Sequence, residues 1–423
     1  MPSPATPYQP DATTRGPSAP WLAFGFLLAG LGTVILGNIL PVIIANWHLT
    51  DSQTGPLFFA KFTGAFIGGI SVPRRLRLGI LSGTILCCLG FGAFAFCHNL
   101  LPGSLTLFLG GIGLGQIIAS TNILAGHRYT AHTGSALASL NFFWSLGAVA
   151  TGLIVGSLMP HFGLRNLLLY LAAAFLIAGL GGALTWTLKS PGGPFMRSTL
   201  RMSGEPQQPG APDLSHLEIG VSSVPETSNL KPETFPRNAL FLFATLLFLY
   251  GGLETCLTGW LTTYTVRYSD EHLLAGQSAT VLLWTALTVG RALASIALRY
   301  IREATMQRLG LALSFLFIAA LALTHRALPL SICCILLGLA LAPFFPATFA
   351  LLIRRNPTPR QAGFVLAVSG LGAAAFPWLM GIVSTYTGSL RTAMAVPMAL
   401  ALLLLAAGFA PGVEPSHSAN AAI

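Results

Sequence analysis

Charged residues are scarce in this sequence: Asp, Glu, Lys and Arg make up only 8% of its 423 residues, and just 12 residues are acidic. A soluble globular domain carries roughly 25% charged residues, so a water-soluble protein of this size is excluded. Hydrophobic residues account for 53% of the chain, and the mean hydropathy is +0.72. No aqueous core of this length hides so much apolar surface. The sequence therefore predicts a polytopic membrane protein.

Several chemical signatures are missing as well. The six cysteines include two adjacent pairs but no Cys-x-x-Cys, which argues against a metal site or a disulfide framework. There is no Walker lysine motif and no grouping of Ser, His and Asp at membrane depth. The glycine run over 111–115 lies inside an apolar segment without a preceding strand, so it indicates helix packing and not nucleotide binding. We expect no cofactor, no metal and no enzymatic activity.

Twelve apolar runs bounded by charged or turn residues are each long enough to cross a bilayer as a helix. They lack the alternation of barrel strands, so the predicted fold is all-α, with twelve transmembrane helices. The runs cover residues 22–45, 56–73, 78–97, 104–126, 135–159, 167–188, 239–266, 277–298, 308–324, 328–353, 362–386 and 391–411.

Basic residues are distributed unevenly between the two sides of these spans. Sixteen of the 22 Lys and Arg residues fall on one side, together with both chain ends, and four on the other. By the positive-inside rule both termini are expected in the cytoplasm, and the protein in the cytoplasmic membrane. Topology thus explains the net charge of +10 without a nucleic-acid partner. We expect no cleaved signal peptide, because the first apolar run lacks a small-residue cleavage site.

The chain divides into two similar halves. A cytoplasmic tail (1–21) precedes a six-helix bundle (22–188), a polar linker (189–238), a second bundle (239–411) and a cytoplasmic C-terminal tail (412–423). Residues 111–121 (GIGLGQIIAST) align with 338–348 (GLALAPFFPAT), and residues 26–37 (FLLAGLGTVILG) align with 248–259 (FLYGGLETCLTG). Repeated six-helix units in the same orientation are typical of alternating-access transporters with two rocking halves.

Three charged residues lie well inside spans, and each costs roughly 2.5 to 3.5 kcal/mol at a helix centre unless it has a partner or a watery cavity. Glu254 lies in the middle of span seven among small residues, where it either loads and releases a proton during transport or forms a structural pair. Lys61 either pairs with Glu254 across the halves or extends outward to solvent. Arg291, near the cytoplasmic end of span eight, is expected to gate the pathway or to pair with a helix terminus or an acidic loop residue.

Uncharged polar and aromatic side chains form the predicted substrate site. Amides donate and accept hydrogen bonds, and aromatic rings offer flat faces to a sugar; the alternatives are hydrogen bonds between helices and packing against lipid. Two prolines, Pro343 and Pro346, remove amide donors from span ten and predict a hinge there. The predicted substrate-binding residues are Asn38, Gln116, Asn122, Asn141, Trp144, Tyr250, Trp260, Gln277, Trp284, Phe345 and Trp378.

Four motifs resemble the major facilitator superfamily, and within it the fucose permease-like sugar:proton symporters. They are Leu40-Pro41 followed by residues 49–64, Tyr250-x-Gly-x-Glu254 with Gly259-Trp260, the segment from Trp284 to Gly290-Arg291, and Gly338-x-x-x-Ala-Pro-x-Phe-Pro346. The resemblance covers about 390 residues. It implies a central cavity lined by spans one, four, seven and ten, with the substrate near the midplane.

The sequence departs from the fucose permease pattern at two positions, so the roles of the family's residues there do not carry over to this chain. Asn38 stands where fucose permeases carry an acid in span one, and Ile118 replaces the acid before the span-four Asn. If transport is driven by protons, Glu254 is therefore the residue expected to carry the coupling proton. We expect a monomeric secondary transporter for a small neutral polyhydroxylated solute, a hexose, coupled to protons or sodium. The alternatives are an uncoupled sugar uniporter, an exporter of amphipathic drug-like or lipid-like compounds, and a membrane receptor or scaffold without net transport.

Overall fold

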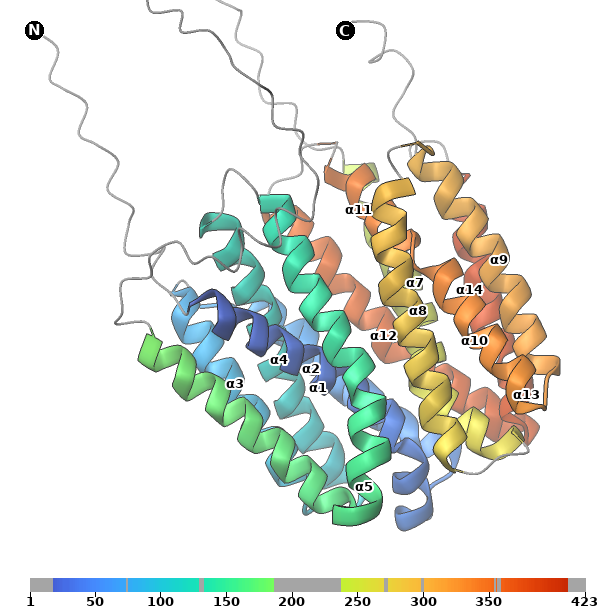
Figure 1. Ribbon diagram of the computed structural model, residues 1–423, viewed down its shortest axis with the longest axis horizontal. Coiled ribbons are helices and arrows are strands. Elements are labelled where there is room, and N and C mark those ends of the chain that lie inside the picture. Colours follow the sequence, from blue (N-terminus) through green and yellow to red (C-terminus); the bar gives the residue numbers. More distant parts are fainter. Residues whose placement is uncertain are drawn as a thin grey trace, which may run out of the picture.

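The computed structural model describes residues 18–73, 75–128, 133–185, 237–269, 273–297, 300–353, 355 and 359–409, and in these ranges every regular element is a helix (Figure 1). The all-α prediction is confirmed. The helices are α1 (Ala19–Trp47), α2 (Asp51–Ile70), α3 (Leu76–Phe94), α4 (Leu100–Arg128), α5 (Thr133–Thr185), α7 (Arg237–Tyr268), α8 (Leu273–Ala297), α9 (Glu303–Leu323), α10 (Ala327–Leu341), α11 (Phe344–Ile353), α12 (Pro359–Thr387), α13 (Leu390–Ala393) and α14 (Ala395–Ala407).

These helices occupy all twelve predicted ranges. Spans five and six form the long element α5, which turns back on itself at Gly163, where φ is 75° (Figure 1). Span ten is divided into α10 and α11 at Ala342 and Pro343, as the prolines predicted. Within the described ranges, nine helices are long and apolar enough to cross a membrane. Most of the predicted linker, 189–238, and most of both predicted tails lie outside the described residues.

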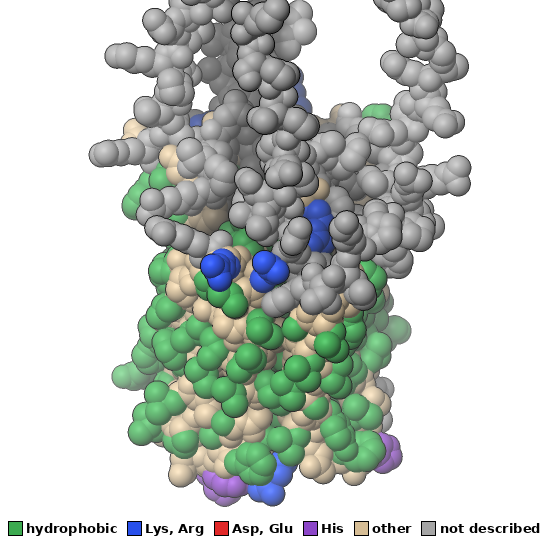
Figure 2. All heavy atoms as spheres, turned by 90° about the vertical axis from the view of Figure 1, so that its left-hand side faces the viewer, with side chains coloured by type: hydrophobic (Ala, Val, Ile, Leu, Met, Phe, Trp, Pro, Cys, Tyr) green, Lys and Arg blue, Asp and Glu red, His purple; other side chains and the backbone are tan. Residues whose placement is uncertain are grey.

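Large apolar side chains cover the outside of the bundle. Leu101, Phe241 and Leu323 are each more than 70% exposed. Figure 2 shows one such face, where hydrophobic side chains form a broad band between basic residues above and histidine and basic residues below. Such a surface is incompatible with water but suits the hydrocarbon core of a bilayer, where basic residues lie at the two interfaces. The protein is a multi-pass membrane protein.

Three helix pairs make the most extensive contacts between the described parts of the N-terminal half (α1 to α5) and the C-terminal half (α7 to α14): α2 with α12, α1 with α7, and α5 with α8. Helices α1 and α7 cross at Gly37 and Gly259. A Cβ atom on Gly37 would lie 2.6 Å from the Thr258 carbonyl oxygen and 2.8 Å from the Gly259 Cα. The two glycines are equivalent positions of the predicted repeat, so the same residue type in each half permits this close approach.

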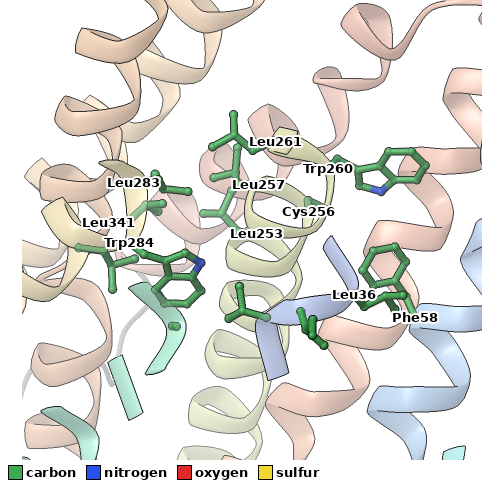
Figure 3. Packing of buried hydrophobic residues seen from close by; sticks show 14 of the residues in the cluster. Leu36, Phe58, Leu253, Cys256, Leu257, Trp260, Leu261, Leu283, Trp284 and Leu341 are labelled. Atoms are coloured by element: carbon green, nitrogen blue, oxygen red, sulfur yellow. The ribbon is translucent and has the colours of Figure 1, made fainter. Parts of the chain in front are cut away.

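A packed apolar core surrounds α7 (Figure 3). Leu253, Leu257 and Trp260 of this helix are almost fully buried. Trp260 extends toward Phe58 of α2, with ring centroids 6.3 Å apart, while Trp284 of α8 lies on the other side of α7. This packing fixes α7, and with it Glu254, at the junction of the two halves.

Candidate functional site

A cavity of about 170 Å³ lies between the two halves. Six helices contribute to its wall: α1, α2 and α5 from the N-terminal half, and α7, α8 and α12 from the C-terminal half. The wall combines aromatic rings, hydroxyl groups and the carboxylate of Glu254. Its lining residues are Thr33, Val34, Gly37, Phe58, Phe62, Trp144, Gly251, Glu254, Thr255, Thr258, Gly259, Trp284, Ser369, Gly370 and Ala373.

Helices α4 and α10 are absent from this wall, which corrects the expectation that spans one, four, seven and ten line the cavity. Spans one and seven do. Helix α4 is held away because its glycines pack directly on α2: a Cβ atom on Gly111 would clash with the Lys61 carbonyl, and one on Gly115 with that of Ala65. The glycine run therefore serves helix packing, as predicted. Gly338 packs α10 against Leu283 of α8 in a similar way.

Glu254 forms an ion pair with Arg291 at the cavity. The Nη2 atom of Arg291 donates to Oε1 of Glu254 at 3.0 Å. The Nη1 atom donates to the hydroxyl of Ser145, on α5, at 3.3 Å, so Arg291 bridges the two halves. The side chains of Arg291 and Glu254 are 21% and 17% exposed, so water reaches the pair. This contact supplies the partner that a charge at this depth requires.

The ion pair corrects two sequence-based expectations. Arg291 binds Glu254 and not a helix terminus or an acidic loop residue, because α8 packs beside α7. No ion pair joins Lys61 to Glu254 among the described residues. Lys61 does not extend to solvent either: it is 1% exposed, and its ammonium group donates to the Thr33 carbonyl of α1 at 2.5 Å. It also lies 5.3 Å from the ring centre of Phe62.

Two of the predicted aromatic residues line the cavity. Trp144 and Trp284 meet edge to face across the interface of the halves, with ring centroids 5.5 Å apart. The other four predicted aromatics lie outside the wall. Tyr250 stacks on Phe344, Trp260 donates to the Pro377 carbonyl, Phe345 lies 5.9 Å from the Arg291 guanidinium, and Trp378 packs on Phe59.

Of the five predicted amides, the four whose side chains the structure describes do not line the cavity. Asn38 is buried and donates to the Val34 carbonyl at 3.4 Å, and Gln116 accepts from Ser82 of α3 at 2.8 Å. Asn122 has a buried Oδ1 atom without a hydrogen bond, and Asn141 is exposed. The side chain of Gln277 lies outside the described residues. Gln116 thus has the interhelical role that the sequence left open as the alternative.

The hydroxyl groups of the cavity wall were not predicted from the sequence. Thr33, Thr255, Thr258 and Ser369 all reach the cavity. In apolar helices such residues commonly bond the backbone of the preceding turn, as Thr258 does with the Glu254 carbonyl at 2.9 Å, so sequence alone gives them little weight. One feature of the sequence could have indicated two of these residues: Thr33 and Thr255 occupy equivalent positions of the internal repeat.

A second charged contact joins the halves at the end of the bundle where α2 begins and α7 ends. We call it the Asp51 cluster; its members are Asp51, Arg267 and Ser384. Both Nη atoms of Arg267 donate to the Asp51 carboxylate at 2.6 Å, and Ser384 of α12 donates at 2.6 Å. Asp51 lies in the first turn of α2, where an acid is favoured. The sequence signal was two opposite charges at span ends on the same side.

A bundle of apolar helices with a cavity enclosed by helices from both halves of the chain is the arrangement of a membrane transporter. The family model described as Major Facilitator Superfamily matches residues 22–363. The chain belongs to this superfamily, as its sequence motifs suggested.

Three proteins of similar sequence have names of different kinds, and two of them are named as transporters. The chain is 23% identical over 398 residues to the yeast protein "Bypass of stop codon protein 6" of Saccharomyces cerevisiae, an alignment covering 86% of this chain and 76% of that one. It is 34% identical over 146 residues to the 4-hydroxybenzoate transporter PcaK of Acinetobacter baylyi, covering 33% of this chain and 32% of the relative. The niacin transporter NiaP of the same organism is 30% identical, covering 38% and 36%.

Solved structures show the same fold at low identity. The transporter FucP, in the outward conformation, matches with a TM-score of 0.57 at 16% identity, over 92% of this chain and 98% of its own. A bacterial homologue of the lysosomal transporter Spinster, in an inward-facing and occupied conformation, matches with a TM-score of 0.66 at 13% identity, over 92% and 95%.

Proposed function

We propose that the protein is a secondary transporter of the cytoplasmic membrane that moves a small, single-ring solute by alternating access, with Glu254 carrying a coupling proton. One observation carries the proposal: the only acid in the cavity wall, among the described residues, lies at the contact between the two halves. A carboxylate in that position changes its surroundings whenever the halves move, as a coupling group must.

The size of the cavity supports a ligand of one ring. An engineered protein cavity of about 150 Å³ holds one benzene molecule. At about 170 Å³ this cavity suits a ring of similar size with a few polar substituents. The hydroxyls of Thr33 and Thr258 donate to backbone carbonyls and offer acceptor oxygens to a solute, Thr255 adds a third hydroxyl, and the two tryptophans supply flat faces. These groups favour a hexose, the solute expected from the sequence.

A single-ring aromatic acid is the second candidate. The guanidinium of Arg291 lies beside the cavity. An arginine suits a carboxylate well because its donors match two oxygens. Relatives named as 4-hydroxybenzoate and niacin transporters are similar to about a third of the chain, which favours the same class.

The cationic excess on one side of the spans supports cytoplasmic termini. In that orientation the Asp51 cluster faces the outside of the cell, and its contacts hold that mouth closed. A solute bound in the cavity would then pass to the cytoplasm through the opposite end. The protein is expected to work as a monomer, because each chain carries both halves of the pathway.

Uptake into proteoliposomes containing the purified full chain tests these assignments. Labelled glucose, galactose, fucose and 4-hydroxybenzoate are supplied with an imposed proton gradient, a sodium gradient or none. We expect saturable accumulation of one solute class, abolished by a protonophore. Accumulation driven by sodium alone would contradict proton coupling, and saturable uptake without accumulation would indicate a uniporter. Extrusion of a labelled amphipathic drug without uptake of any ring solute would indicate an exporter.

A further inference from the structure

We propose that Glu254 and the carboxylate of the solute compete for the guanidinium of Arg291, so that the solute binds as an anion together with one proton. This inference rests on the proposed transport function, selects its second candidate solute, the single-ring aromatic acid, and names the coupling step. It depends on the N–H groups of Arg291 that make no hydrogen bond, and on one further N–H group in the cavity wall that lacks an acceptor.

Arg291 is only partly satisfied in the described structure. Its Nη2 atom reaches one oxygen of Glu254, its Nη1 atom reaches Ser145 at 3.3 Å, and the guanidinium also hydrogen-bonds the Tyr250 hydroxyl, but its buried Nε atom has no hydrogen-bond partner. The contrast with the Asp51 cluster is direct, since Arg267 there uses two nitrogens on two carboxylate oxygens at 2.6 Å. A guanidinium carries five N–H donors and is strongest in a bidentate pair. Arg291 therefore has capacity for a second carboxylate.

Trp284 supplies an independent donor that lacks an acceptor. Its Nε1 atom is buried without a hydrogen-bond partner, although the residue lines the cavity. In Figure 3 the indole nitrogen lies on the side of the ring that faces α7. Trp284 precedes Arg291 by two helical turns on α8, so both residues lie on one face of that helix. A buried N–H without an acceptor is costly, and a solute oxygen would satisfy it.

The charged groups around Glu254 are few. Arg291 faces it from α8. The Tyr250 hydroxyl lies near it on its own helix, donates to the Leu341 carbonyl and is hydrogen-bonded to Arg291. The described parts of α1, α2, α5 and α12 present hydroxyl, aromatic and aliphatic groups to the cavity. Lys61 bonds the Thr33 carbonyl of α1 and does not line the wall. Arg291 is therefore the cation for which two carboxylates would compete.

The exchange balances in charge and atoms. Before binding, the site holds an ionised Glu254 and the Arg291 cation. The Glu254 carboxylate takes one proton from a hydronium ion of the solution, which forms an O–H bond and leaves a water molecule, and the solute carboxylate then accepts hydrogen bonds from Arg291. The net charge of the site is zero before and after. A neutral sugar offers no negative charge to replace Glu254, so it would not require this proton.

Calorimetric binding to the purified full chain tests the inference separately from transport. The probes are 4-hydroxybenzoate, its neutral analogue 4-hydroxybenzamide, and glucose, each titrated in two buffers that differ in ionisation enthalpy. We expect 4-hydroxybenzoate to bind with uptake of one proton and to bind more tightly as the pH falls. The amide should bind roughly tenfold to hundredfold more weakly, because a hydrogen-bonded charge is lost.

Variants separate competition from a structural role. Glu254→Gln should retain 4-hydroxybenzoate binding but lose the proton uptake and the pH dependence. Arg291→Lys should weaken binding roughly tenfold or more, because the bidentate geometry is lost. Trp284→Phe should weaken binding without changing the number of protons. Arg326→Gln, at an exposed cation in the loop before α10, is the matched control and should behave as the wild type.

Several results would overturn the inference. These are binding of 4-hydroxybenzoate without proton uptake, loss of that binding in Glu254→Gln, equal binding of acid and amide, or failure of both to bind. Glucose binding without proton uptake, with no binding of the acid, would also overturn it while leaving the transport function intact. Proton-linked binding of the acid without any flux in proteoliposomes would uphold the inference and refute the proposed function.

Discussion

Arg267 of α7 donates both of its terminal nitrogens to the carboxylate of Asp51 on α2, each at 2.6 Å, and thereby ties the C-terminal half to the N-terminal half. Ser384 of α12 adds a third hydrogen bond to the same carboxylate. Nearby, the backbone amide of Ser52 donates to the hydroxyl of Thr385 at 2.9 Å. These contacts close one end of the interface, which makes them the first target for mutation.

Asp51→Asn should loosen this end. The substitution removes the charge that balances Arg267 and should cost the closed conformation about 2 to 5 kcal/mol, as truncation of a hydrogen-bonded charge pair does. Disulfide formation between cysteines placed at Ser52 and Thr385, in a chain whose six native cysteines are replaced, reports closure. We expect slower cross-linking in Asp51→Asn. Arg391→Gln is the control, because its contact with His325 lies within the C-terminal half; equal rates in all three proteins would refute a closing role.

Glu254→Gln should uncouple transport from the proton gradient. Glutamine preserves the shape and one acceptor oxygen but cannot release a proton. In proteoliposomes we expect loss of gradient-driven accumulation, while exchange of labelled for unlabelled solute across the membrane continues. Accumulation equal to that of the wild type would exclude Glu254 as the coupling group.

Lys61→Met should leave coupling intact. Among the described residues the buried ammonium group has one carbonyl partner and no carboxylate partner. Replacing a buried charge by an apolar side chain of similar size is often neutral or stabilising. We expect an unchanged or higher unfolding temperature in detergent and normal gradient-driven accumulation. Loss of accumulation with a normal unfolding temperature would instead assign Lys61 to the coupling step.

Gly37→Ala should destabilise the contact between the halves. The added Cβ would lie 2.6 Å from the Thr258 carbonyl oxygen, and backbone on both sides leaves no flexible group to move away. Overpacking of this kind costs about 1 to 3 kcal/mol, so the unfolding temperature should fall. Gly25→Ala lies on the same helix, and no heavy atom lies within 4 Å of its added Cβ. Because alanine favours a helix more than glycine does, Gly25→Ala should leave the unfolding temperature unchanged or raise it. A similar fall in both variants would show that the crossing is not responsible.

The sequence predicted the helical architecture well because hydrophobic length and turn residues are local properties. Each predicted span has a helix, and even the break in span ten follows from Pro343. Glu254 was found for the same reason, since an acid stands out within an apolar run. Its partner was not predicted, because which face of α8 meets α7 is decided by packing. The described amides do not line the cavity, and a polar side chain such as Gln116 bonds equally well between helices.

The crossing of α1 and α7 at Gly37 and Gly259 also bears on how the halves move. Glycines present smooth backbone there, without side chains that interlock and have to be withdrawn. One half can tilt against the other at this point with little change in local contact, while separations grow toward both ends of the bundle. The paired glycines thus lie where a pivot between the halves would be. Displacements about this pivot would be largest at the two ends of the bundle, where the two mouths of the pathway lie.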